Sequence, residues 1–277
     1  MMKRTSLGNN RLIRKFQELS ERNEAALICY VVAGYPDILT TDDIVSTIVK
    51  GGADIIEIGI PFSDPIADGP TIQEASYRAL VGGVTPEKSL EISKNIRIKY
   101  PSIPIVILTY SNILQKAGFE NFMKNSKECG VDGFILPDMA IEESDMYVTE
   151  ASRLGLATIF LTSPNTTPSR LEAILSKASG FIYVVSVYGT TGQRNSFENY
   201  SFTVIRNVKR VVGSRLPLAV GFGISSPSHI KPMLRAGADA IIVGSAIVDI
   251  IKNFSINKKK MLQQVEVFVR NMKKACK

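Results

Sequence analysis

The sequence GADIIEIGIPFSDPIADGPTIQ, residues 52–73, contains a short apolar run followed by a loop rich in proline and glycine. The run at 54–59 is rich in isoleucine, which is typical of a strand buried on both faces of a parallel sheet. Within the run, Glu57 interrupts the apolar stretch between Ile56 and Ile58. The segment therefore predicts a buried strand that leads into an irregular loop.

Similar runs, rich in β-branched residues, recur along the whole chain. There are eight of them, at residues 27–32, 54–59, 103–109, 133–137, 156–161, 181–186, 216–221 and 238–243. The segments between the runs have apolar residues at helical spacing, so a helix is expected after each strand. Eight such units predict an α/β protein with a single closed (β/α)8 barrel, or TIM barrel. An open doubly wound sheet would give a similar local pattern, but the count favours closure.

Several helix boundaries are predicted from capping residues. Thr40 and Asp43 have the spacing of a capping box, and the glycine pair at 51–52 is expected to end the helix that follows. Thr-Pro pairs at 85–86 and 167–168 predict two further helix starts, because proline fits the first helical turn.

The N-terminal segment predicts one additional helix. Leu12, Phe16 and Leu19 recur at helical spacing and indicate an amphipathic helix that covers the underside of the barrel. We therefore expect one domain over residues 1–277, with a helical cap at 1–24 and the barrel at 25–277. The alternative is an organelle-targeting segment, because five basic residues precede the first acidic one.

Composition excludes several classes of protein. Of the 277 residues, 45% are hydrophobic and 21% are charged, which excludes a disordered, collagenous or coiled-coil chain. The net charge of +7 is spread along the chain, so it fits an anionic substrate better than a nucleic acid. The three cysteines lack the spacing of a disulfide framework, and we expect a cytoplasmic protein. No apolar stretch is long enough to predict a membrane span.

Glu57 is the first candidate for catalysis. Because side chains alternate along a strand, it is expected to point opposite to Ile56 and Ile58, toward the barrel axis. Burial there would raise the pKa of its carboxyl group and let it donate as well as accept a proton. The alternative is a structural carboxylate paired with lysine or arginine, but no basic residue lies nearby in the sequence.

The loop after this strand carries two further carboxylates, Asp64 and Asp68, among three prolines and a glycine. The catalytic groups of such barrels lie at the carboxyl ends of the strands, so this stiff loop can hold a second carboxylate over the site. The other aspartate would then hydrogen-bond loop amides, as aspartate commonly does in turns. Spacing alone does not choose between them.

Two glycine-bearing turns, at 221–225 and 244–246, follow the seventh and eighth runs. Barrels often bind phosphate at these two positions through backbone N–H groups, although the glycines could simply turn the chain. The polar, glycine-hinged segment at 188–195 predicts a mobile lid. His229 is the only histidine and is expected at the surface, so a His-based metal site or catalytic triad is not predicted.

The motif EIGIPFSDPIADGPTIQ at 57–73 closely resembles the signature of the tryptophan synthase alpha subunit family. Further motifs follow in the family order: GYPD at 34–37, LTYSN at 108–112, LPD at 136–138, YVVS at 183–186, GTTG at 189–192, GFGIS at 221–225 and GSAIV at 244–248. The motif at 57–73 is highly specific, whereas the glycine turns recur in other phosphate-binding barrels.

The resemblance implies a carbon-carbon lyase that cleaves indole-3-glycerol phosphate to indole and glyceraldehyde 3-phosphate in tryptophan biosynthesis. It implies that Glu57 is the general acid and base and that Asp68 accepts a hydrogen bond from the indole N–H. It further implies Tyr183 beside these carboxylates, with Tyr30 and Leu108 against the indole ring. The remaining substrate contacts that it implies, mainly to phosphate, are Thr191, Gly192, Gly221, Gly223, Gly244 and Ser245.

The resemblance also implies a partner. The family's beta subunit carries pyridoxal phosphate and receives indole through a tunnel in an α2β2 heterotetramer, whereas the alpha subunit needs no cofactor and no metal. Asp64, Pro65 and Asn112 match the docking segments, with ordinary loop roles as the alternative. The chain departs from the family at Tyr30, where phenylalanine is common, and at 187–188 before the lid.

Two other functions compete with this interpretation. A different phosphate-binding barrel of aromatic amino acid synthesis, such as indole-glycerol-phosphate synthase, would need a catalytic lysine on a strand, and the eight runs contain none. A non-catalytic chain that only activates a beta subunit is the other possibility. The presence of both Glu57 and Asp68 argues against it.

Overall fold

Eight parallel strands close into a barrel in the computed structural model, which describes residues 8–185, 194–221 and 223–277. Each strand pairs with the next one along the chain, and the last pairs with the first. The strands are β1 (Ala26–Val32), β2 (Ile55–Gly59), β3 (Ile105–Leu108), β4 (Gly133–Ile135), β5 (Ala157–Thr162), β6 (Ile182–Val185), β7 (Leu218–Gly221) and β8 (Ala240–Val243). All eight predicted runs are confirmed as strands, and the closed order excludes the doubly wound alternative.

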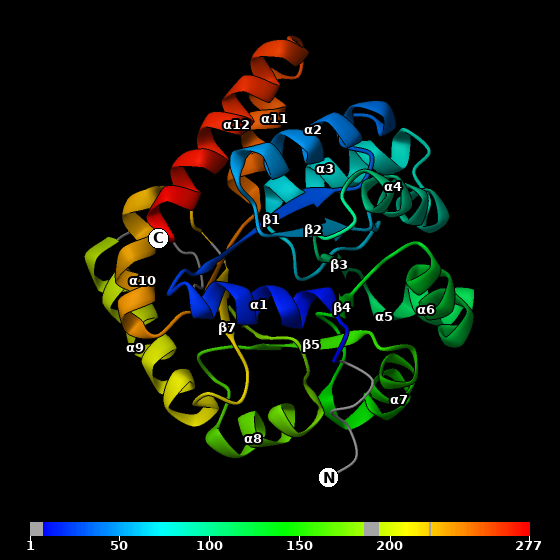
Figure 1. Cartoon of the computed structure of the whole chain (residues 1–277). Helices are drawn as coiled ribbons and strands as arrows, with labels where there is room; N and C mark the ends of the chain where they lie inside the picture. The colour runs from blue at the N-terminus through cyan, green and yellow to red at the C-terminus, as the bar shows by residue number, and fades with distance from the viewer. Residues whose placement is uncertain (1–7, 186–193, 222) are drawn as a thin grey trace.

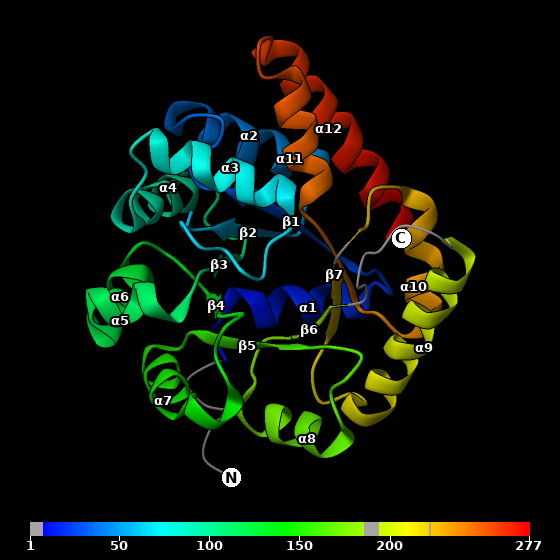
Figure 2. The ribbon, with the colours of Figure 1, turned by 180° about the vertical axis from the view of Figure 1, so that it is seen from behind.

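Helices form a ring outside the strands (Figures 1 and 2). They are α2 (Ile38–Gly51), α3 (Pro70–Val81), α4 (Pro86–Lys99), α5 (Ser111–Ala117), α6 (Phe119–Glu128), α7 (Asp145–Leu154), α8 (Pro168–Lys177), α9 (Arg194–Val212), α10 (Ile230–Ala236), α11 (Ser245–Phe254) and α12 (Lys258–Ala275). Two short 3-10 helices, η1 (Ile141–Glu143) and η2 (Pro227–His229), precede α7 and α10. The strand side chains that point outward form one large apolar core with the inner faces of these helices.

The helix α1 (Arg11–Glu21) covers one end of the barrel, as Figure 1 shows. Its buried residues Leu12, Phe16 and Leu19 join the apolar cluster of the barrel interior. The ring of Phe16 lies 5.8 Å from that of Phe181, at the start of β6. The amphipathic helix is therefore confirmed, and it closes the end at which the strands begin.

A buried ion cluster fixes α1 to the barrel. Asp132 is 1% exposed and accepts hydrogen bonds from Arg97 Nη2 at 2.7 Å, Arg11 Nη1 at 3.0 Å and the backbone N–H of Ile105 at 2.9 Å. Asn10, which caps α1, donates through Nδ2 to the carbonyl oxygen of Asp132 at 2.8 Å. These contacts hold α1 over the end of the barrel at which the strands begin. The cavity described below lies at the other end.

One predicted helix start was wrong. The helix α2 begins at Ile38, and Asp37 caps it by accepting a hydrogen bond from the backbone N–H of Thr40 at 2.8 Å. The Thr40 hydroxyl donates to the other carboxylate oxygen of Asp37, so it cannot serve as the cap itself. The end at Gly52 is confirmed, and Thr85 and Thr167 cap α4 and α8 as predicted.

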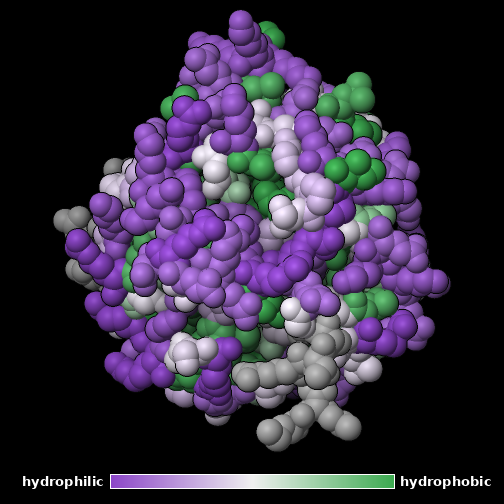
Figure 3. Space-filling model, in the orientation of Figure 1, coloured by the Kyte–Doolittle hydropathy of each residue, from purple (hydrophilic) through white to green (hydrophobic). Residues whose placement is uncertain are grey.

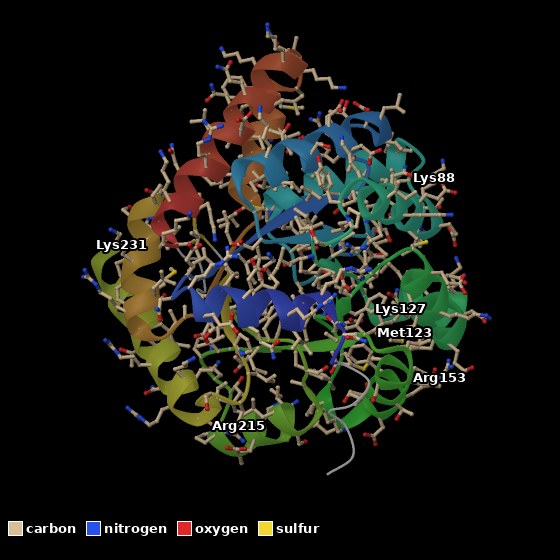
Figure 4. All side chains as sticks on the ribbon, viewed as in Figure 1. Lys88, Met123, Lys127, Arg153, Arg215 and Lys231 are labelled. Atoms are coloured by element: carbon tan, nitrogen blue, oxygen red, sulfur yellow. The ribbon has the colours of Figure 1, made fainter. Side chains whose placement is uncertain are left out.

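The outer surface is mainly hydrophilic in the view of Figure 3, with scattered apolar patches. Figure 4 shows Lys88, Lys127, Arg153, Arg215 and Lys231 at separate places around the ring, so these five basic residues do not form one stripe. In the described ranges, every helix is too short or too polar to cross a membrane.

Candidate active site

A cavity of about 320 Å³ opens at the carboxyl ends of the strands, at the opposite end from α1. Figure 2 shows this end of the barrel, with α1 behind the strands. The cavity is lined by Tyr30, Glu57, Ala67, Asp68, Gly69, Pro70, Thr71, Ile72, Leu108, Pro137, Leu161, Tyr183, Gly223, Ile224, Ile242, Gly244, Ser245 and Asp249. Most of its wall is thus apolar or aromatic, and a few polar groups converge on it.

Glu57 points into this cavity from β2, as its position in the strand predicted. It is in register with Tyr30 of β1 and Val106 of β3, and it is 1% exposed. Its Oε2 atom has no hydrogen-bond partner among the described residues. Burial, and secondarily the charge of Asp68, raises the pKa of Glu57 to about 8. Glu57 is therefore protonated at neutral pH and free to donate.

Asp68 faces the same cavity from the loop between β2 and α3. Burial raises its pKa to about 6, while a hydrogen bond from the Tyr110 hydroxyl favours the ionised form. That hydroxyl lies 3.2 Å from Asp68 Oδ2 and also accepts from the backbone N–H of Ala67 at 3.1 Å. Near pH 7 the cavity therefore holds one neutral carboxyl group and one carboxylate, the pairing that acid-base chemistry requires.

The conformation of this loop shows which of its two aspartates supplies the second carboxylate to the cavity. Asp64 is exposed and accepts a hydrogen bond from the neighbouring Ser63 hydroxyl at 2.5 Å. Asp68 is held inward because its backbone N–H donates to Pro65 O at 3.0 Å and its carbonyl oxygen accepts from Gln73 Nε2 at 2.9 Å. The loop is thus tied at both ends of the segment that presents Asp68.

Two tyrosines of the cavity wall, Tyr30 and Tyr183, pack against glycines of the neighbouring strands. A Cβ atom at Gly59 would lie 2.1 Å from the hydroxyl oxygen of Tyr30, and one at Gly221 would lie 2.5 Å from that of Tyr183. Both tyrosines are buried, and burial holds the pKa of each hydroxyl well above its ordinary value. Each glycine therefore makes room for a tyrosine, and Gly221 contacts Tyr183 without lining the cavity itself.

The far side of the cavity has the features of an anion site. Gly244 precedes the first turn of α11, which Ser245 begins, and both residues line the cavity with Gly223. The first N–H groups of a helix have no partners within the helix and attract anions. Gly223 has a φ of +71°, a conformation that favours glycine. The structure does not describe residues 188–193 of the predicted lid, which include Thr191 and Gly192.

Some predicted residues lie outside the cavity, and others that line it were missed. Asn112 is exposed on α5, and Asp64 and Pro65 sit on the outer part of the β2 to α3 loop. Tyr110 was missed as a site residue, although it lies two residues after the end of β3 and Leu108 of the same LTYSN motif was included. Tyr110 binds Asp68 but does not itself line the cavity; the wall residues that were missed are Ala67, Gly69, Pro70, Thr71, Ile72, Pro137, Leu161, Ile224, Ile242 and Asp249.

In the described part of the chain, no three histidine, cysteine, aspartate or glutamate side chains gather in a way that could hold a metal ion. His229 is partly buried in η2 and does not line the cavity. What the cavity can supply is an acid, a carboxylate, an aromatic wall and helix-terminal N–H groups.

Comparison with known proteins gives one consistent result. A family model described as tryptophan synthase alpha chain matches residues 16–277. The tryptophan synthase alpha chain of Methanocaldococcus jannaschii is 46% identical over 242 residues, which are 87% of this chain and 85% of that protein. The crystal structure of tryptophan synthase subunit alpha from Legionella pneumophila matches with a TM-score of 0.88 at 32% identity, covering 96% of this chain and 98% of that one. A structure of the tryptophan synthase α2β2 complex from Pyrococcus furiosus matches with a TM-score of 0.83 at 38% identity, covering 90% and 98%.

Proposed function

The chain belongs to the tryptophan synthase alpha chain family, and we propose that Glu57 and Asp68 carry out the chemistry of that family in the cavity described above. Members of the family are lyases that cleave indole-3-glycerol phosphate to indole and glyceraldehyde 3-phosphate. The bond to be broken joins C3 of the indole ring to a side-chain carbon that carries a hydroxyl group. Its cleavage requires a proton at C3 and the loss of a proton from that hydroxyl.

Glu57 supplies and then removes the proton. Because its pKa is raised to about 8, the carboxyl group is protonated at neutral pH and can donate to C3. The resulting carboxylate then accepts the hydroxyl proton as the carbon-carbon bond breaks, and the electron pair of that bond returns to the ring. One group thus serves as acid and then as base, and it ends the cycle in its starting state.

Asp68 stabilises the ring while it is protonated at C3. In that intermediate the ring nitrogen carries positive charge, and a carboxylate that accepts its N–H hydrogen bond lowers the energy of the charged state. With a pKa of about 6, Asp68 is largely ionised at neutral pH. Tyr183, Tyr30 and Leu108 provide the wall against which the ring lies.

The phosphate end of the substrate is placed by the two glycine-bearing turns. Gly223, Gly244 and Ser245 bring backbone N–H groups to the cavity, and the N-terminus of α11 adds its dipole. We include Gly221, Thr191 and Gly192 in this site as predicted contacts.

The family works as a complex with a beta subunit, and this chain has the same partner. We propose that Asp64, Pro65 and Asn112, which lie outside the cavity, contact that subunit and that indole leaves toward it. Pyridoxal phosphate is assigned to the beta subunit and no cofactor to this chain. The proposal also treats residues 1–277 as one domain and the cytoplasm as its location.

The observation that carries the proposal is the buried carboxyl group of Glu57, whose Oε2 atom has no partner among the described residues, in the same cavity as Asp68. It is tested by measuring indole release from indole-3-glycerol phosphate by the purified chain, with and without an added beta subunit. Glu57→Gln should lower kcat by at least about a hundredfold, since general acid-base catalysis contributes that much. Glu172→Gln, at an exposed position of α8, is the matched control. Near-normal indole release by Glu57→Gln would refute the assignment.

For Asp68→Asn we expect a large fall in kcat with a small change in KM, because the interaction strengthens as the ring becomes charged. A change confined to KM would instead show that Asp68 only binds the substrate.

A further inference from the structure

The hydroxyl group of Tyr30 occupies the cavity without a partner. Tyr30 is 4% exposed and lines the cavity, yet in the part of the chain that the structure describes its hydroxyl makes no hydrogen bond. Its oxygen is not among the fully buried atoms that lack a partner in the described ranges, so it is open to the cavity. A phenol hydroxyl that faces a binding cavity with no partner in the described ranges is a candidate ligand contact.

The position of this hydroxyl is fixed by its neighbours on both sides. A Cβ atom at Gly59 would lie 2.1 Å from Tyr30 Oη, so the hydroxyl rests on the carboxyl end of β2. The other edge of the ring adjoins Gly244, where a Cβ atom would lie 3.2 Å from Tyr30 Cδ1. The ring thus spans from the start of α11 to the end of β2, and Glu57 is its register neighbour on β2.

A donor and an acceptor without partners in the described ranges therefore face the same cavity from adjacent strands. Glu57 Oε2 has no hydrogen-bond partner in the described ranges, and its pairing with Tyr30 in the barrel register places both side chains on the cavity side of adjacent strands. One substrate hydroxyl group would satisfy both of them, because a hydroxyl can donate to a carboxylate and accept from a phenol.

We propose that the Tyr30 hydroxyl is a catalytic hydrogen-bond donor to the substrate oxygen that becomes the aldehyde oxygen. This inference rests on the proposed function and adds a third group to it. As the carbon-carbon bond breaks, the substrate hydroxyl gives its proton to Glu57, and the electrons of its O–H bond form the new C=O bond. The oxygen carries partial negative charge during this step, and a fixed O–H donor stabilises that charge.

The surroundings of Tyr30 keep it a donor. Burial, together with the charges of Asp68 and Glu57, holds the pKa of the Tyr30 hydroxyl well above its ordinary value. The phenol therefore stays protonated and donates a hydrogen bond without transferring its proton. The proton balance of the reaction remains with Glu57 alone.

The test is Tyr30→Phe, which removes one oxygen atom and keeps the ring between Gly59 and Gly244. We expect kcat for indole release to fall about tenfold, the value of one hydrogen bond of about 1.4 kcal/mol, while KM stays within about twofold. The matched control is Tyr35→Phe, because Tyr35 is equally buried but does not line the cavity. Circular dichroism and thermal unfolding of both variants check that the fold is retained.

A second measurement separates the hydroxyl contact from ring packing. Indole-3-propyl phosphate has the ring and the phosphate but no side-chain hydroxyl group, so Tyr30→Phe should leave its Kd within about twofold of wild type. An unchanged kcat in Tyr30→Phe would overturn the proposal, and so would an equal loss of affinity for this analogue. A wild-type chain that releases no indole, with or without a beta subunit, would instead refute the proposed function itself.

Discussion

Replacing Tyr110 with phenylalanine should shift the acidic limb of the pH profile and leave kcat/KM near pH 8 almost unchanged. The Tyr110 hydroxyl donates to Asp68 Oδ2 at 3.2 Å, and this bond favours the ionised carboxylate. Removing the donor therefore raises the pKa of Asp68 above its value of about 6. Since activity requires ionised Asp68, the acidic limb of kcat/KM must move to higher pH.

The size of the shift follows from the hydrogen bond. A hydrogen bond to a charged group contributes roughly 1.5 kcal/mol at the weak end of its range, which corresponds to about one pKa unit. A distance of 3.2 Å places this bond at that weak end. With the pKa moved from about 6 to about 7, kcat/KM should fall about fivefold at pH 6, about twofold at pH 7 and hardly at all at pH 8.

The assay is indole release under kcat/KM conditions from pH 5 to 9, for wild type, Tyr110→Phe and the control Tyr77→Phe. Tyr77 is 68% exposed on α3, so its hydroxyl should not affect the profile. The wild-type profile should be bell-shaped with limbs near 6 and 8, from ionised Asp68 and protonated Glu57. A loss in Tyr110→Phe that is uniform across pH, or an unmoved acidic limb, would refute the reasoning.

Three further predictions concern the packing and the buried charges. Gly59→Ala places a Cβ atom 2.1 Å from Tyr30 Oη, so the tyrosine ring must move. We therefore expect kcat to fall at least tenfold in the indole assay. An unchanged kcat would show that Tyr30 can move without loss of activity. Glu57 has a pKa of about 4.5 when unfolded and about 8 when folded, so the stability that its protonated form contributes is lost progressively between pH 4.5 and pH 8. Glu57→Gln should therefore raise Tm at pH 9 relative to wild type but not at pH 5, and equal Tm differences at both pH values would contradict this. Asp132→Ala leaves two arginine side chains without their buried partner, so it should lower the free energy of unfolding in urea by about 3–5 kcal/mol. The control, Glu172→Ala, removes one partner of an exposed ion pair and should change that free energy by less than about 1 kcal/mol. Similar losses in the two variants would refute the distinction between buried and exposed pairs.

The residues that the sequence identified best are those whose environment follows from local periodicity. Eight apolar runs predicted eight strands, because a strand buried on both faces must be apolar at nearly every position. The inward direction of Glu57 followed from the alternation of side chains along β2. The apolar face of α1 followed from helical spacing in the same way. Each of these inferences needs only the residues adjacent in the chain.

Local patterns were less reliable where two neighbouring groups compete. Thr40 has the spacing of a cap, but the carboxylate of Asp37 accepts from the backbone N–H of Thr40, so the cap lies three residues earlier. The choice between Asp64 and Asp68 also depended on contacts outside the loop. Tyr110, 42 residues further along the chain, binds both Asp68 and the adjacent Ala67.

By itself, the sequence determined the strands, the helical cap, the inward carboxylate and, through its motifs, the family. The tertiary structure decided which groups share the cavity: Glu57 with its register neighbour Tyr30, Asp68 with its hydrogen-bond donor Tyr110 beside it, and the start of α11. Periodicity reports whether a side chain faces apolar surroundings or water, since that depends on the local backbone. Burial of a charge and its hydrogen-bond partners depend on residues brought together by closure of the barrel, and these set the pKa values on which the chemistry rests.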